Sequence, residues 1–221
     1  MLIKLTELKI PFHLNFNNMK IAIDLNDVVR EYTDNFLRYY VERYNHEFDY
    51  DDFEPYTDDK EILFPFKTRE AYERFTYWDY AFELYGKCPV CEKGLETAFN
   101  IWVDKTLPNI DVEESPEVII VSPMEGGATI SATYFFLSKL GVKVREVYFP
   151  KDSLTIWDKC DVLVTANPKL LEAKPNGKIS VRIAKQYNED CSADMTYKTF
   201  CRFLEDDEII EKIVKKEYEK E

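Results

Sequence analysis

Side chains that could carry chemistry directly follow several apolar runs of this sequence. In order along the chain they are Asp24, Asn26, Asp27, Ser122, Lys151 and Thr165; an alanine, Ala166, stands at the next comparable position. A carboxylate in such a set can act as a nucleophile or hold a cation, whereas a hydroxyl or an amine can hold a phosphate. An amide can neither accept nor release a proton at neutral pH. Whether these groups act together depends on the elements that position them.

Short β-branched runs alternate with amphipathic segments, and this alternation indicates a parallel α/β sheet. Strands are expected at residues 20–24, 118–121, 142–149, 161–164 and 178–183. Helices are expected at residues 29–44, 68–85, 95–107, 128–140 and, in the tail, 195–204 and from 207 onward. Short helical turns are expected at residues 153–159 and after Pro168. Because ligands bind at the carboxyl ends of strands in an open parallel sheet, the polar residues should meet at one edge.

The positions of the expected strands divide the chain into domains. Residues 46–115 show no strand pattern and are rich in aromatic and acidic side chains, so they are expected to form a helical cap inserted after the first strand. Residues 19–45 and 116–190 then form the α/β core. Residues 1–18 are interpreted as an N-terminal arm, and residues 191–221 as C-terminal helices.

The order of these motifs resembles that of the haloacid dehalogenase (HAD) superfamily of phosphotransferases. The run Ile-Ala-Ile that ends at Asp24 resembles the first motif, and the run Val-Ile-Ile-Val that ends at Ser122 resembles the second. Lys151 can serve as the third motif, and residues 161–168 resemble the fourth. The resemblance covers residues 20 to about 190, and the layout is most similar to the 5′(3′)-deoxyribonucleotidase-like group.

This resemblance implies a fold and a mechanism. The implied fold is a three-layer α/β sandwich, with a Rossmann-like parallel sheet and a helical cap inserted after the first strand. In the family, the first aspartate attacks phosphorus, so Asp24 occupies the nucleophile position. Ser122 and Lys151 are then expected to hold the phosphate, and neighbouring carboxylates are expected to hold Mg²⁺.

The sequence departs from the family pattern at the positions that matter most. Asn26 stands where the family has its general acid, and Asp27 replaces a glycine. Thr165 and Ala166 replace the carboxylates that hold Mg²⁺, which leaves Asp24 and Asp27 as weak metal ligands. The sequence therefore favours a catalytically degenerate relative, a pseudoenzyme with no cofactor and a protein-binding or structural role.

The alternative is a Mg²⁺-dependent phosphatase, a 5′-nucleotidase that acts on nucleoside monophosphates through a phospho-aspartate. Simpler interpretations also stay open. Asp24, Asn26 and Asp27 can each cap the following helix. Ser122 can be a turn hydroxyl, and Lys151 can be a solvated lysine.

The aromatic residues of the expected cap are a further candidate feature. Seven aromatic side chains lie between residues 72 and 85. Phe75, Trp78 and Phe82 follow helical spacing and are expected to join the cap to the sheet. Because seven rings are more than one small helix can bury, some aromatic surface is expected to remain for a protein partner.

The net charge and the cysteine content restrict which binding partners and which cellular compartment are expected. Lys and Arg number 29 and Asp and Glu 42, so the net charge of −13 argues against binding nucleic acid or anionic membranes. Five cysteines and no recognisable secretory signal favour a reducing cytoplasm, with either Met1 or Met19 as the start. Cys88-Pro-Val-Cys91 lacks the second ligand pair of a zinc site.

The expected partners are other proteins in a multi-subunit assembly. One concrete form of this hypothesis is a phage-encoded component inside a phage particle.

Overall fold

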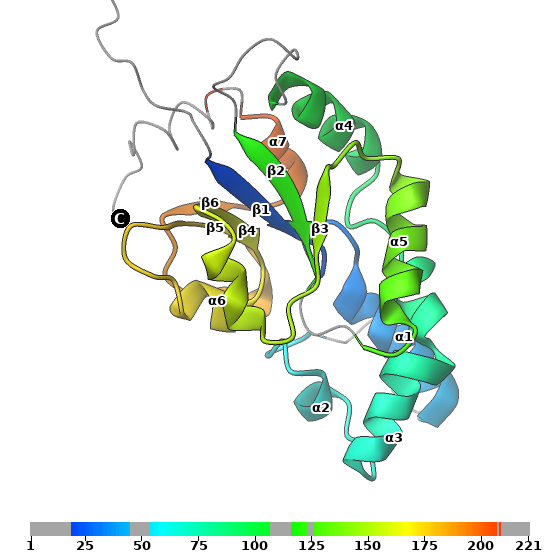
Figure 1. Cartoon of the computed structure of the whole chain (residues 1–221). Coiled ribbons are helices and arrows are strands. Elements are labelled where there is room, and N and C mark those ends of the chain that lie inside the picture. The colour runs from blue at the N-terminus through cyan, green and yellow to red at the C-terminus, as the bar shows by residue number, and fades with distance from the viewer. Residues whose placement is uncertain (1–18, 45–53, 107–115, 123–125, 207, 209–221) are drawn as a thin grey trace, which may run out of the picture.

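Six parallel strands form the framework of the protein. A computed structural model describes residues 19–44, 54–106, 116–122, 126–206 and 208. The strands are β1 (Lys20–Asp24), β2 (Glu117–Val121), β3 (Glu146–Tyr148), β4 (Val162–Thr165), β5 (Ile179–Ile183) and β6 (Met195–Tyr197). They form one all-parallel sheet in the order β3-β2-β1-β4-β5-β6 (Figure 1). The expected α/β class with a parallel, Rossmann-like sheet is therefore confirmed.

Helical segments connect and cover these strands. The α-helices are α1 (Tyr32–Tyr44), α2 (Lys60–Leu63), α3 (Arg69–Arg74), α4 (Leu95–Thr106), α5 (Thr129–Leu140), α6 (Pro168–Glu172) and α7 (Phe200–Leu204). Two π-helical turns, η1 (Phe75–Asp79) and η2 (Phe82–Gly86), follow α3. Two 3₁₀ turns are η3 (Ser153–Asp158) and η4 (Gln186–Asn188). Among the described residues, no helix is long and apolar enough to cross a membrane.

The sheet is buried on both faces because the inner positions of its central strands are apolar, at residues 21–23, 118–121 and 162–164. Alternate side chains of β1 point to opposite faces: Ile21 and Ile23 pack with α4, α5 and α7, whereas Ala22 packs with η3 and α6. Phe99 of α4 and Phe200 of α7 meet edge to face, with ring centroids 5.2 Å apart. Three layers result, with the sheet in the middle.

The segment inserted between β1 and β2 builds a second cluster near the carboxyl ends of the strands. Aromatic side chains of α1 and of the segment from α2 to η2 fill this cluster; the Phe36 and Phe64 rings stack at 4.9 Å. In Figure 1 this part lies below the sheet, beside α5. Helix α1 therefore packs with the cap, whereas α4, later in the same insertion, packs on the sheet.

Local signals mark several helix ends correctly. Thr68 caps α3, since its hydroxyl accepts from the Ala71 amide at 3.1 Å. Gly141 ends α5 in the left-handed conformation, with φ of 66°. Asn167 caps α6, just after β4. The helix that was expected from residue 207 and the N-terminal arm fall outside the described residues.

Three expectations about secondary structure are wrong. Residues 195–197 form β6, not a helix, because they alternate between the core and solvent and pair with β5. Residues 60–63 form a helical turn where no helix was expected, since Asp59 caps it. The strand that was expected at 142–149 shortens to three residues, because β3 is an edge strand that pairs with β2 over that length only.

The helix expected at 68–85 is not continuous. It changes from α3 into the π-helical turns η1 and η2, and each such turn holds more residues than an α-helical turn. This shifts the buried face: Phe75 lies in the cap cluster, but Trp78 is 66 % and Phe82 39 % exposed. The expectation that Trp78 and Phe82 join the cap to the sheet is therefore wrong.

Candidate functional site

The crevice between β1 and β4 is the point where the connections across the sheet change direction. The chain runs through β1, β2 and β3 to one edge and then returns to β4 on the other side of β1. Open α/β sheets bind ligands at such a switch point. Asp24 ends β1 and Thr165 ends β4, and Oγ1 of Thr165 donates to Oδ2 of Asp24 at 2.7 Å. The candidate site is centred on this pair.

Asp24 is almost completely buried, at 1 % exposed. Burial raises the pKa of its carboxyl to about 7, although hydrogen bonds from Thr165 and from the amide of Asn26 favour the charged form. A large fraction of Asp24 is therefore protonated near neutral pH. A protonated carboxyl is a poor nucleophile.

Arg30 is a buried cation that engages two of the predicted site residues. Its Nε donates to Oδ1 of Asn26 at 2.7 Å, and its Nη2 donates to Oγ of Ser122 at 2.8 Å. Its Nη1 donates to Oγ1 of Thr133 at 2.8 Å, and the guanidinium lies 4.7 Å from the Tyr85 ring centroid. Arg30 therefore holds the side chains at the general-acid and phosphate-binding positions of the resemblance.

Asp27 turns its carboxylate toward α1. Its φ of 59° is unusual for a residue with a Cβ. Oδ1 accepts from the Thr33 amide at 2.8 Å, while Oδ2 accepts from the Thr33 hydroxyl and, at 2.9 Å, from the Tyr187 hydroxyl. Burial alone would raise the pKa of Asp27, but Lys60, Lys185 and the Thr33 hydrogen bonds lower it overall. Asp27 is thus a charged, fully engaged carboxylate.

Lys60 is the second buried cation and comes from α2. Its Nζ donates to the Thr33 hydroxyl at 2.6 Å and to the Asp58 carbonyl at 3.3 Å. Burial lowers the pKa of this amine, whereas the carboxylates of Asp27 and Asp58 oppose that shift. Lys60 therefore ties the cap to the turn after β1.

The remaining predicted site residues lie in different surroundings. Ser122 is buried against Arg30 and does not line the cavities beside Asp24. Lys151 is exposed in the turn after β3 and does not line them either. Ala166 is buried, and its carbonyl accepts from Nδ2 of Asn188 at 2.8 Å. Of the expected set, Asp24, Asn26 and Asp27 share one cavity wall.

Two neighbouring cavities, which share lining residues, lie over these residues. The deeper one, of about 60 Å³, is lined by Asp24, Asn26, Asp27, Tyr32, Asp58, Lys60, Asn167 and Tyr187. The outer one, of about 320 Å³, shares five of these residues and adds Tyr72, Tyr77, Tyr85, Arg69, Glu61, Asp59, Ser153 and Lys169. The cavity therefore lies between the sheet and the cap.

The site offers a poor set of donors for Mg²⁺, which takes several oxygen ligands, including carboxylates. Thr165 and Ala166 supply no carboxylate, and both oxygens of Asp27 already accept hydrogen bonds. Within the described residues, no group of three or more His, Cys, Asp or Glu side chains could hold a metal ion. The residues present do not fit the Mg²⁺ site that the phosphatase alternative requires.

The sequence pattern did not single out Arg30, Lys60 or Tyr32. Three other cavity residues, Tyr72, Tyr77 and Tyr85, belong to the aromatic residues of the expected cap that the sequence marked as a candidate feature. Arg30 lies four residues after Asn26 and directly after the apolar pair Val28 and Val29. Its position at the end of an apolar run was the signal that could have indicated its burial. Lys60 stands in an acidic stretch, where nothing in the sequence indicates burial. Comparison of the chain with protein-family models and with curated proteins returned no match.

Proposed function

We propose that this chain is a non-catalytic relative of the HAD phosphotransferases that acts by binding other proteins within a multi-subunit assembly. The observation that supports the loss of catalysis is the pair of hydrogen bonds from Arg30 to Asn26 and Ser122. Phosphoryl transfer needs groups that position the phosphate and a group that handles the proton. In this chain the Arg30 guanidinium binds the side chains at both positions, Asn26 and Ser122, and the Asn26 amide cannot act as a general acid.

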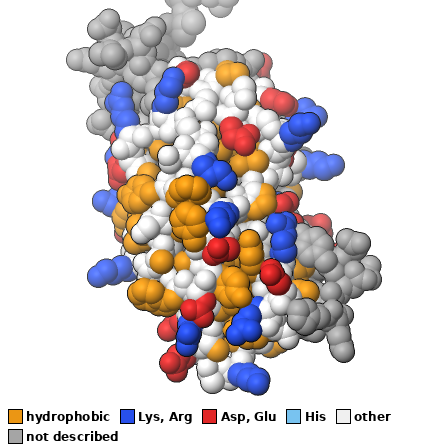
Figure 2. Space-filling view, turned by 90° about the vertical axis from the view of Figure 1, so that its right-hand side faces the viewer, with side chains coloured by type: hydrophobic (Ala, Val, Ile, Leu, Met, Phe, Trp, Pro, Cys, Tyr) orange, Lys and Arg blue, Asp and Glu red, His pale blue; other side chains and the backbone are white. Residues whose placement is uncertain are grey.

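An exposed apolar face supports the binding role. Trp78 and Phe82 of the π-helical turns lie near α5, whose Tyr134 and Phe135 are 52 % and 41 % exposed. The rings of Phe82 and Phe135 lie 4.7 Å apart. Figure 2 looks onto the side that carries α5 and shows hydrophobic side chains gathered among charged ones. Contiguous exposed aromatic side chains are typical of protein-binding surfaces.

A hydrolysis assay tests the loss of catalysis. The purified chain is incubated with Mg²⁺ and nucleoside monophosphates or p-nitrophenyl phosphate, beside Asp24→Asn. We expect no turnover above that of Asp24→Asn. Turnover that disappears in Asp24→Asn would contradict the proposal. A variant that combines Arg30→Ala with Asn26→Asp, Thr165→Asp and Ala166→Asp is expected to gain activity if it folds.

A surface variant tests the binding role. Sedimentation of the purified chain over a concentration series tests a second copy as the partner. Cross-linking in native extract, followed by titration with the purified partner, tests other proteins. We expect Phe135→Asp to weaken association at least tenfold, roughly the effect of losing a buried aromatic anchor. Ile101→Asp, an exposed apolar position on α4, is the matched control. Association that Phe135→Asp leaves unchanged would exclude this face.

A further inference from the structure

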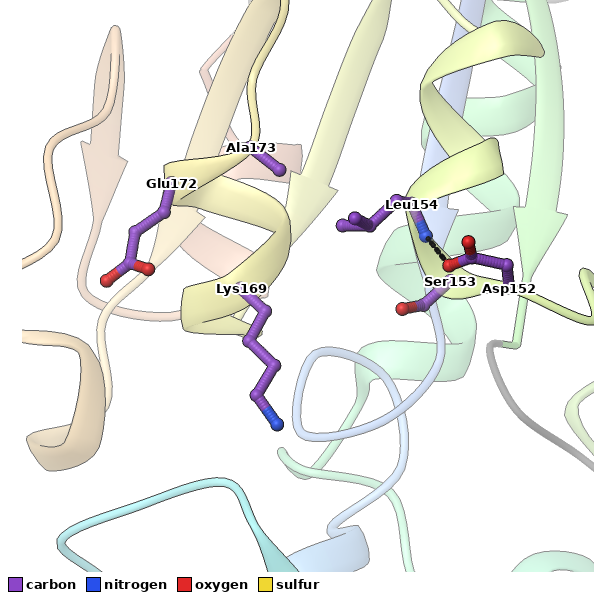
Figure 3. A pocket seen from close by; sticks show the side chains of 6 residues that line it. All are labelled: Asp152, Ser153, Leu154, Lys169, Glu172 and Ala173. Atoms are coloured by element: carbon purple, nitrogen blue, oxygen red, sulfur yellow. Dashed lines mark hydrogen bonds between the residues drawn. The ribbon is translucent and has the colours of Figure 1, made fainter.

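Three hollows follow one another from the sheet to the surface. The 60 Å³ floor beside Asp24 and the 320 Å³ cavity under the cap share five lining residues. An outer groove of about 450 Å³ between η3 and α6 shares Ser153 and Lys169 with that cavity. Figure 3 shows this groove, with Lys169 reaching from α6 and Leu154 facing Ala173. The middle cavity has the size of small-molecule sites, which begin at about 300 Å³.

Four tyrosines line the middle cavity. Tyr32 and Tyr85 share a hydrogen bond between their hydroxyls at 2.8 Å, and their ring centroids lie 5.1 Å apart. Tyr72 and Tyr77 meet edge to face at 6.1 Å. Such rings offer apolar faces to a flat or puckered ring, together with hydroxyls that donate and accept.

The charges around the cavity compensate one another. Three cations and three carboxylates line it: Lys60, Arg69, Lys169, Asp58, Asp59 and Glu61. Arg69 forms an ion pair with Glu61, and Nζ of Lys169 lies 3.7 Å from the Asp59 carboxylate. A phosphate would add a charge of about −1.5 to −2 and would meet as many carboxylates as cations. A neutral ligand meets no such repulsion.

The floor is polar and small. Its volume of about 60 Å³ is about a fifth of that of the cavity above it. Asn167 lines the floor, and its Oδ1 accepts from the amides of Lys169 and Leu170. Within the described residues, its Nδ2 has no hydrogen-bond partner. A hydroxyl or hydroxymethyl group can accept a hydrogen bond from this donor without adding charge, whereas a phosphate would add negative charge beside Asp27 and Asp58, which also line the floor.

We infer that this cavity binds a neutral, hydroxylated ring compound, a sugar ring either free or within a nucleoside, and discriminates against its phosphate ester. The inference rests on the proposed function in one respect, since Arg30 binds the Ser122 hydroxyl, which would otherwise hold a phosphate. The tyrosines contact the ring, the floor takes a hydroxyl, and the paired charges disfavour an added anion.

Calorimetric titration of the purified chain tests this inference. The probes are ribose and glucose, uridine and adenosine, and the 5′-monophosphate of each nucleoside. We expect at least one neutral compound to bind saturably and at least tenfold more tightly than its phosphate ester. If ribose or glucose binds, the ligand is a free sugar. If only uridine or adenosine binds, the ligand is a nucleoside. If no neutral compound binds, or if a monophosphate binds as tightly, the inference is wrong.

Matched variants locate the ligand. Tyr77→Ala is expected to weaken binding at least tenfold, whereas Tyr56→Ala, at an exposed tyrosine that does not line the cavity, should leave it unchanged. Ser153→Phe narrows the entrance from the surface side and keeps the test valid if Tyr77→Ala fails to fold. Binding that survives both cavity variants would overturn the inference. Hydrolysis of a phosphate ester would instead contradict the proposed function, so the two failures are distinguishable.

Discussion

The Arg30 guanidinium donates to the Ser122 hydroxyl at 2.8 Å, although 92 positions separate these residues in the sequence. The bond joins the turn after β1 to the end of β2 in a region without water access. Because Arg30 also holds Asn26 and Thr133, it connects the floor of the site to α5. A buried arginine of this kind depends on its partners, since an unpaired charge in the interior is strongly unfavourable.

Arg30→Met is expected to destabilise the fold by about 3 kcal/mol, because it leaves the buried acceptors of Arg30 without their donor. Urea unfolding followed by circular dichroism measures the change. Arg74→Met removes an exposed arginine paired with Asp79 and should change stability by less than about 0.5 kcal/mol. Equal stability of the two variants would show that the Arg30 network contributes little.

Asp24 predicts a particular dependence of stability on pH. The pKa of its carboxyl is about 7 in the folded chain, against an ordinary value of 3.8, so the folded state binds this proton more tightly than the unfolded state. The contribution of Asp24 to stability therefore falls as the pH rises from about 4 to about 7. Asp24→Asn removes this contribution.

The stability of Asp24→Asn relative to the wild type should accordingly increase across that range, by on the order of 3 kcal/mol, and level off above it. Urea unfolding at several pH values measures the difference. The same substitution at Asp104, an exposed carboxylate on α4, controls for the loss of one aspartate. A difference that does not depend on pH would contradict the raised pKa.

Gly127 lies where α5 begins and touches the cap closely. A Cβ there would stand 2.4 Å from the Tyr77 carbonyl oxygen, and φ is 54°. The Ala128 amide donates to that same carbonyl at 2.9 Å, so the approach cannot relax cheaply. Gly127→Ala should cost about 2 kcal/mol or more.

Gly126→Ala is the matched control, because the space around Gly126 is open and its φ is not in the left-handed region. Thermal unfolding of the two variants side by side provides the comparison. Similar midpoints for both would mean that the cap and α5 are not packed as closely as the structure shows.

Thiol reactivity should follow burial. Burial raises the pKa of the Cys160 thiol to about 12, and Cys88 is equally buried, with its pKa raised as well. Since the thiolate is the reactive form, both should alkylate at least about a hundredfold more slowly in the folded chain than in urea. Mass spectrometry after timed iodoacetamide treatment measures the rates at each site. Cys191, only partly buried, should react first; rapid labelling of Cys88 would argue against its core position.

Much of the fold could be predicted because its signals are local. The apolar runs that became β1, β2, β4 and β5 have the composition of strands buried on both faces, and Thr68 and Gly141 mark helix ends by their own backbone preferences. The π-helical turns after α3 could not be predicted, because the packing of the cap cluster decides which aromatic side chains of that segment are buried.

The candidate site, too, could be predicted from the sequence only in part. The sequence by itself determined that Asp24, Asn26 and Asp27 follow the first strand and that Thr165 and Ala166 follow the fourth, so it identified one edge of a parallel sheet and the absence of the expected carboxylates there. Only the tertiary structure decided that Arg30 and Lys60 lie inside, beside Ser122 and Asp27. The physical reason is that the partners of a buried charge come from distant segments, which meet only when the cap packs on the sheet and excludes water.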